Sequence, residues 1–198
     1  MTFPYRIRAA AAAALLAVAP LSVEALTPQE AQSLTQTIVT EVEGYVNSAQ
    51  PLAAKQAAFK ETMDRYADTG AIARYVLGAP WRTATPAQQE AFIAAFRDYV
   101  ANKYGSQFSE YNGGSTAVNS ARDLGQRGVV VMTTVTRPGA SPVEVEWQFS
   151  DRSGQPLLID IIAEGVSLLA TERAAVSQML DRRGGDIDAL IRDLPTQG

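Results

Sequence analysis

Residues 157–168, LLIDIIAEGVSL, restrict the fold of this chain more than any other stretch. Successive side chains of a strand point to opposite faces, and a strand here is apolar on both faces: Leu157, Ile159 and Ile161 on one, Leu158 and Ile162 on the other. Such a strand has to be covered on both faces. We therefore expect a central strand that ends at Gly165 and passes directly into a helix. Helix should cover one of its faces and a second apolar layer the other.

The first 25 residues have the organisation of a secretory signal peptide. Arg6 and Arg8 precede an apolar run at residues 9–19, and Ala25 ends a cleavage motif of small residues. The run is shorter than the roughly 20 apolar residues that a helix needs to cross a bilayer. We therefore predict an exported protein whose folded part is residues 26–198.

The composition excludes several kinds of chemistry. The chain has no Cys and no His, so it contains no Ser-His-Asp triad, no thiolate nucleophile and no zinc site built from these ligands. Its formal net charge is −4, whereas a nucleic-acid surface needs clustered Lys and Arg. Only carboxylates, Lys, Tyr and hydroxyls remain for acid–base work, and we expect no metal site and no nucleic-acid partner.

Helices are predicted for the first half of the chain. Thr27 with Glu30, and Thr85 with Gln88, have the spacing of capping boxes and are each followed by Pro at the first helical position. Glycine and proline positions separate the remaining periodic segments. The expected helices cover residues 27–48, 51–66, 71–77 and 86–103.

The pattern changes to alternation after residue 114, with expected strands at 116–124, 129–137 and 143–149 before the opening strand. Short turns between consecutive strands indicate an antiparallel meander, and helices are expected again at 171–182 and after Asp186. The fold class is therefore α+β, with helices wrapped round a curved meander sheet of about four strands. We expect a single domain over 26–198, with a helical part at 27–110, the sheet at 115–164 and C-terminal helices at 166–195.

Ordered stretches of the chain resemble one protein family. They are FKETMDRYADTGAIARYVLGAPWRTATPAQQEAFIAAFRDYV at 59–100, DIIAEGVSLLATER at 160–173 and GGDIDALIRDL at 184–194. In this order they are similar to the MlaC, or toluene-tolerance, family of periplasmic phospholipid-binding proteins. The resemblance covers nearly the whole of the chain after the predicted signal peptide.

The resemblance implies a sheet of the NTF2- or cystatin-like kind and an apolar pocket between sheet and helices. Phospholipid acyl chains would fill this pocket as cargo, with the headgroup near its mouth and no other cofactor. Such a protein would be periplasmic and non-catalytic. It would carry lipid between an outer-membrane lipoprotein–porin complex and an inner-membrane ABC transporter complex.

Candidate lipid-binding residues are the large apolar side chains of the expected helices and sheet. For each of them ordinary core packing is the alternative, since the same residue types dominate protein cores. The candidates are Trp81, Phe92, Phe96, Tyr99 and Tyr104 from the helices, Val145, Trp147, Ile159 and Ile161 from the sheet, and Val166 and Leu169 near the turn.

Charged residues add further candidates. Arg74, Arg82, Arg97 and Arg173 can meet a phosphate through the planar fork of an arginine. The alternative is structural pairing, for Arg97 with Glu90 or Asp98. Glu164 is expected to accept hydrogen bonds from backbone N–H groups at the turn before the last helices.

Other functions remain possible at the level of the sequence. At Ala67, Pro156 and Val176 the chain has smaller residues than the family usually carries. These residues would change the shape of the pocket, so a carrier of a different lipid, such as a hopanoid, is one alternative. An NTF2-like enzyme that works through carboxylates is a further alternative, and Asp160 is its candidate acid or base.

Overall fold

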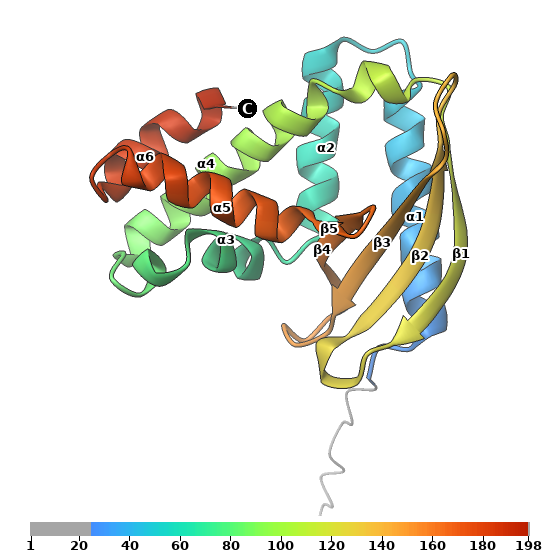
Figure 1. Cartoon of the computed structure of the whole chain (residues 1–198), viewed down its shortest axis with the longest axis horizontal. Helices are drawn as coiled ribbons and strands as arrows, with labels where there is room; N and C mark the ends of the chain where they lie inside the picture. Colours follow the sequence, from blue (N-terminus) through green and yellow to red (C-terminus); the bar gives the residue numbers. More distant parts are fainter. Residues whose placement is uncertain (1–24, 198) are drawn as a thin grey trace, which may run out of the picture.

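The computed structural model describes residues 25–197, so the predicted signal peptide lies outside the described residues except for Ala25. Most of the helices gather at one end of the molecule, and the sheet lies at the other with α1 beside it and α2 in between (Figure 1). The α-helices are α1 (Pro28–Val46), α2 (Leu52–Tyr66), α3 (Thr69–Leu77), α4 (Pro86–Gly105), α5 (Leu168–Asp181) and α6 (Ile187–Asp193). Short 3-10 helices are η1 (Ala79–Arg82), η2 (Phe108–Tyr111), η3 (Gly125–Arg127) and η4 (Leu194–Gln197).

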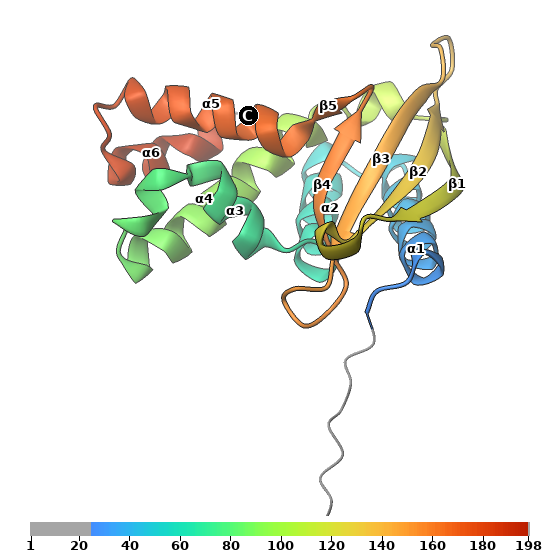
Figure 2. The ribbon, with the colours of Figure 1, turned by 60° about the horizontal axis from the view of Figure 1, so that its bottom comes forward.

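The sheet is an antiparallel meander, as predicted, in the order β1-β2-β3-β4-β5. Its register shifts between Val118 and Ser120 and between Gln148 and Phe149, and such irregularities bend a strand. Figure 2 shows the resulting curved sheet with α1 packed beside it. The strands are β1 (Ser115–Asp123), β2 (Val129–Thr136), β3 (Val143–Ser150), β4 (Leu157–Ala163) and β5 (Val166–Ser167).

The chain after β4 differs from the prediction. The strand ends at Ala163 rather than at Gly165, and Glu164 and Gly165 have positive φ angles of 50° and 79°. Two consecutive residues of this conformation close a tight hairpin, which pairs the short β5 with the end of β4. The fifth strand was missed because two residues are too short for an alternating pattern.

Local capping signals fix the helix starts. Both predicted capping boxes are formed, with Thr27 accepting from Glu30 and Thr85 from Gln88. The start of α5 at Leu168 corrects the prediction of residue 171. The side chain of Ser167 accepts a hydrogen bond from the backbone N–H of Ala170 at 3.0 Å and so caps the helix one turn earlier.

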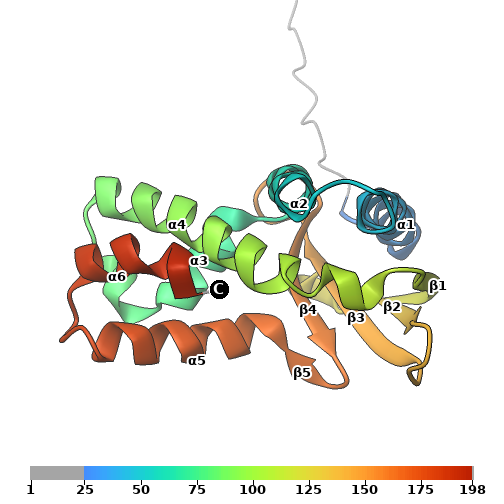
Figure 3. The same cartoon turned by 90° about the horizontal axis from the view of Figure 1, so that it is seen from above.

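Buried apolar residues form separate cores rather than one. Residues of α3 to α6 make a helical core, including Phe92, Tyr99, Val176 and Leu190. A sheet core lies between α1 and the sheet, and a small third core lies under α1, α2 and η2. Seen from above, the helices of the helical core lie at one end and the sheet with α1 at the other (Figure 3).

The turn between η3 and β2 allows a direct test of the sheet geometry. Gly128 has a φ of +86°, and a Cβ there would overlap the carbonyl oxygen of Phe149, whereas Gly125 has a φ of +61° in open space. We expect Gly128→Ala to lower the free energy of unfolding by about 3 kcal/mol and Gly125→Ala by only about 1 kcal/mol. Urea unfolding followed by circular dichroism measures both. Equal losses would show that the close approach to β3 does not matter.

Candidate functional site

An apolar cavity of about 360 Å³ lies at the junction of the three cores. Ile38 and Val42 of α1, and Phe59 and Met63 of α2, line one side. Other apolar parts of the wall come from α3, α4, η2, the sheet and α5: Ile72, Val76, Phe96, Val100, Tyr104, Phe108, Trp147, Leu158, Ile159, Ile161, Leu168 and Leu169. The cavity is thus built from elements that are far apart in the sequence.

Strand β4 borders this cavity because most of its outer edge has no strand partner. It pairs with β3 along its length but with β5 only at Ile162 and Ala163, and α2 ends against it through the bridge of Ala67 to Leu158. Leu158 also packs on the sheet core. The predicted alternation along this strand is wrong at Leu158. The register shift beside Ile159 pairs Leu158 with Phe149 and Ile161 with Trp147, so Leu158 and Ile161 share one face of the sheet and both line the cavity.

The predicted lipid-binding residues fall into two groups. On the cavity wall are Phe96, Tyr104, Trp147, Ile159, Ile161 and Leu169. Away from it are Trp81, Phe92 and Tyr99, which belong to the helical core, together with Val145 and Val166, of which Val166 is 58% exposed. All four large residues of the α4 stripe pack in the helical core, but Phe96 and Val100 also line the cavity, whereas Phe92 and Tyr99 do not.

Wall residues of α1 and α2 were not among the predicted lining. The signal was present in the apolar stripes of both helices, where Ile38 and Val42, and Phe59, Met63 and Tyr66, recur at helical spacing. Periodicity identifies the apolar face of a helix but not the surface that it meets. Assigning these residues required knowledge of the tertiary arrangement.

Acidic groups on the wall are held by donors of the protein itself. Glu43 accepts from the backbone N–H of Thr116 at 2.6 Å. Asp160 accepts from the hydroxyl of Ser167 at 2.6 Å and from the backbone N–H of Leu169 at 2.9 Å. The prediction that Glu164 accepts at this turn was wrong, since Asp160 has that role and the exposed Glu164 forms the hairpin turn.

A third wall acid, Glu172 of α5, is only 3% exposed and lies at the centre of a polar cluster. It accepts from the hydroxyl of Tyr99 at 2.8 Å, from the ammonium of Lys103 at 2.7 Å and from the hydroxyl of Tyr104. The ammonium of Lys103 also donates to the Tyr99 hydroxyl at 3.0 Å. The tyrosine hydroxyls that could have met a ligand are therefore engaged with Glu172.

Protonation states in this cluster follow from burial and from Glu172. Burial raises the pKa of Tyr99 and of Tyr104, and hydrogen bonds to Glu172 raise both further. Burial acts to lower the pKa of Lys103, but its hydrogen bonds to Glu172 and Tyr99 outweigh this and the pKa is raised. At neutral pH the tyrosines are neutral and Lys103 is charged, so the cluster forms a neutralised part of the wall.

Among the four arginines considered from the sequence, Arg97 alone lies on the cavity wall. Its terminal nitrogen donates to Asp64 of α2, and not to Glu90 or Asp98 as the sequence suggested. Asp98 pairs instead with Lys60. Arg173 donates to the carbonyl of Tyr75 at 2.8 Å and lies over its ring.

The fold and the cavity define a class, an α+β protein in which an apolar cavity lies between helices and a meander sheet. The family model of the MlaC protein matches residues 28–196. The chain therefore belongs to the MlaC family, which confirms the resemblance found in the sequence.

Two relatives match this chain over more than half of its length. The toluene tolerance protein Ttg2D of Pseudomonas putida is 26% identical over 185 residues, covering 89% of this chain and 84% of that protein. The intermembrane phospholipid transport system binding protein MlaC of Haemophilus influenzae is 24% identical over 120 residues, and the match covers 59% of this chain and 55% of that protein.

A solved structure has the same fold. It is that of the phospholipid-binding protein from Ralstonia solanacearum in complex with a phospholipid. The match has a TM-score of 0.70 and 22% sequence identity, and it covers 84% of this chain and 97% of that one. The α+β fold predicted from the sequence is thereby confirmed.

Within residues 25–197, no three acidic, His or Cys side chains come together in a group that could hold a metal ion. In the same part of the chain, every helix is too short or too polar to cross a membrane.

Replacing the carboxylate of Glu172 by an amide should destabilise the fold. We expect Glu172→Gln to lower the free energy of unfolding by roughly 2–4 kcal/mol, because Lys103 loses its counter-charge and the amide accepts fewer hydrogen bonds. Thermal and urea unfolding measure the loss. Glu90→Gln, the same substitution at an exposed position of α4, is the control and should change stability by less than about 0.5 kcal/mol.

Proposed function

We propose that this protein is a non-catalytic phospholipid carrier that holds acyl chains in the cavity. The observation that carries the proposal is an apolar cavity whose acids are all engaged by donors of the protein. Membership of the MlaC family and the names of the relatives support the same cargo.

Apolar contact alone is sufficient to hold this cargo. Burying a methylene group contributes about 0.8 kcal/mol relative to water, but in a bilayer the acyl chains are already dry. The free energy of transfer between membrane and carrier is therefore close to balance, as a reversible carrier requires.

The size of the cavity indicates that its walls move apart on loading. Sites for drug-sized ligands usually measure roughly 300–1,000 Å³, and this cavity, at about 360 Å³, is near the lower end. A lipid with two long acyl chains is larger than such ligands. We infer that the walls separate as such a lipid enters the space between the cores.

Transport between membranes completes the proposal. The predicted signal peptide at residues 1–25 supports a periplasmic location for a single domain over 26–198. In that location the protein takes up or delivers lipid at an outer-membrane lipoprotein–porin complex and an inner-membrane ABC transporter complex. Family membership supports this proposal, and the Haemophilus influenzae relative is named as the binding protein of an intermembrane phospholipid transport system.

The hydrogen bonds of Asp160 favour a carrier over the enzyme alternative. Its two oxygens accept hydrogen bonds from Ser167 and Leu169 and fasten the start of α5 to β4. A general base needs a lone pair directed at its substrate. The contacts of Asp160 support a structural role.

Extraction of the protein from the periplasm of its own organism tests the cargo. After purification without detergent, we expect organic extraction and mass spectrometry to recover diacyl phospholipid in near-stoichiometric amount. A polycyclic lipid in its place would support the hopanoid alternative. Recovery of no lipid would contradict a carrier.

A substitution that fills the cavity tests where the lipid lies. Ile161 lines the cavity beside its cross-strand neighbour Trp147 of β3, whereas Ile162 points to the other face of β4. We expect Ile161→Trp to reduce bound lipid by at least about half, with a stability change within the roughly 1–3 kcal/mol typical of overpacking. Ile162→Trp is the matched control, and its lipid content should equal that of the wild type. Equal lipid content in both variants would show that the acyl chains lie elsewhere.

A further inference from the structure

Arg97 is the one Lys or Arg on the cavity wall in the part of the chain that the structure describes. The wall also carries the acids Glu43, Asp160 and Glu172, and each of them accepts hydrogen bonds from the protein. The arginine differs from these acids in its contacts. Unlike them, Arg97 has an N–H group that makes no hydrogen bond.

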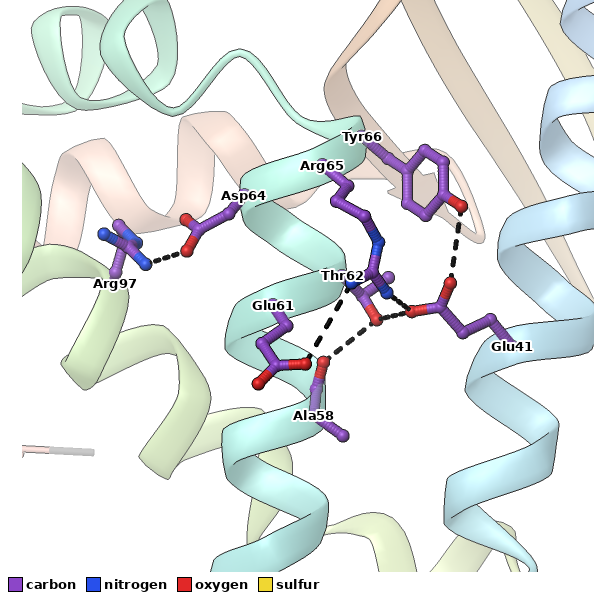
Figure 4. Close-up of polar contacts among 8 residues, drawn as sticks. All are labelled: Glu41, Ala58, Glu61, Thr62, Asp64, Arg65, Tyr66 and Arg97. Carbon is purple, nitrogen blue, oxygen red and sulfur yellow. Dashed lines mark hydrogen bonds and ion pairs between the residues drawn. The ribbon is translucent and has the colours of Figure 1, made fainter.

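The guanidinium of Arg97 is only partly satisfied. A terminal nitrogen donates to Asp64 across the junction of α2 and α4 (Figure 4). The Nε atom is buried and has no hydrogen-bond partner. A buried donor without a partner is costly, and more so when it belongs to a charged group. An additional acceptor at this position would remove that cost.

Arg97 also connects the cavity with the surface. Its side chain is 28% exposed and that of Asp64 is 42% exposed, although Arg97 lines the cavity. A ligand with an apolar part inside the cavity and an anionic part at the surface would therefore bring its anion to Arg97. A phospholipid has this arrangement of chains and phosphate.

The ion pair on the other side of α2 provides a contrast. Arg65 donates to Glu41 of α1, which also accepts from Thr62 and Tyr66 (Figure 4). Arg65 and Glu41 do not line the cavity, and they bind to each other. Together these contacts fasten α1 to α2.

We propose that Arg97 binds the phosphate of the cargo lipid and that Asp64 holds the same guanidinium when the cavity is empty. The proposal rests on lipid carriage as the function of the cavity. Two non-bridging phosphate oxygens match the planar fork of an arginine. Exchange of the Asp64 carboxylate for phosphate satisfies Nε and releases one of the ion pairs that join α2 to α4. Loading of lipid and separation of these two helices are thereby coupled.

Because phosphate and Asp64 compete for Arg97, substitutions of these two residues should change lipid affinity in opposite directions. Arg97→Gln removes the phosphate contact, so affinity for dioleoylphosphatidylglycerol should fall at least about ten-fold. Asp64→Asn removes the competing carboxylate, so the same affinity should rise about three-fold or more. Affinity for dioleoylglycerol, which has the same chains without phosphate, should not fall in either variant, because this lipid gains nothing from Arg97. Arg192→Gln, at an exposed position of α6, is the control for loss of one positive charge.

Displacement of a fluorescent fatty acid from the delipidated protein measures these affinities, and circular dichroism verifies folding. A loss of affinity in both variants, or an equal effect of Arg97→Gln on the two lipids, would assign the ion pair a purely structural role and overturn the proposal. Glycerophosphoglycerol, which has the phosphate without acyl chains, should displace the probe only weakly; binding as tight as that of the lipid would assign Arg97 to a free phosphate instead.

The same experiment separates this proposal from the function on which it rests. Binding of dioleoylglycerol and dioleoylphosphatidylglycerol with equal affinity by the wild type would leave lipid carriage intact and remove the role of Arg97. Binding of neither lipid would contradict both.

Discussion

Polar contacts between its walls maintain the apolar cavity of this protein. Apolar surfaces that face an empty space lose contacts, and closing the space would restore them. Here Glu172 joins α5 to α4, Asp160 joins β4 to the start of α5, and Glu43 joins α1 to β1. Each contact links elements that border the cavity and satisfies its own donors and acceptors. The walls thus keep their spacing while their apolar side chains remain available to a ligand.

Helix α2 is the wall with the weakest attachment by apolar packing. Thr62 is the one buried residue of this helix, and much of the attachment of α2 to α1 and α4 consists of ion pairs and hydrogen bonds at partly exposed positions. Such ion pairs each contribute little to stability. The inner face of α2 nevertheless carries Phe59 and Met63 into the cavity. A wall that is apolar inside and held by polar contacts outside can move without disrupting the helical core or the sheet core.

Sequence reasoning succeeded where a structural signal is local. The capping boxes of Thr27 and Thr85 and the alternation of β3 depend on residues a few positions apart, and the structure has them as predicted. It failed for the start of α5, because the Ser167 cap depends on a hairpin closed by Glu164 in a conformation unusual for a residue other than glycine. It also failed for the partner of Arg97, because Asp64 lies on another helix.

By itself the sequence determined the class of fold and the presence of surplus apolar surface, since residues 157–168 require cover on both faces and no Cys or His offers other chemistry. Family membership followed from ordered motifs. Only the tertiary structure decided which apolar residues form cores and which line the cavity: Phe92 and Phe96 lie on one helix, yet Phe92 belongs to the core alone and Phe96 also lines the cavity. The physical reason is that periodicity fixes the direction of a side chain within its own element, whereas the surface it meets depends on how distant elements pack.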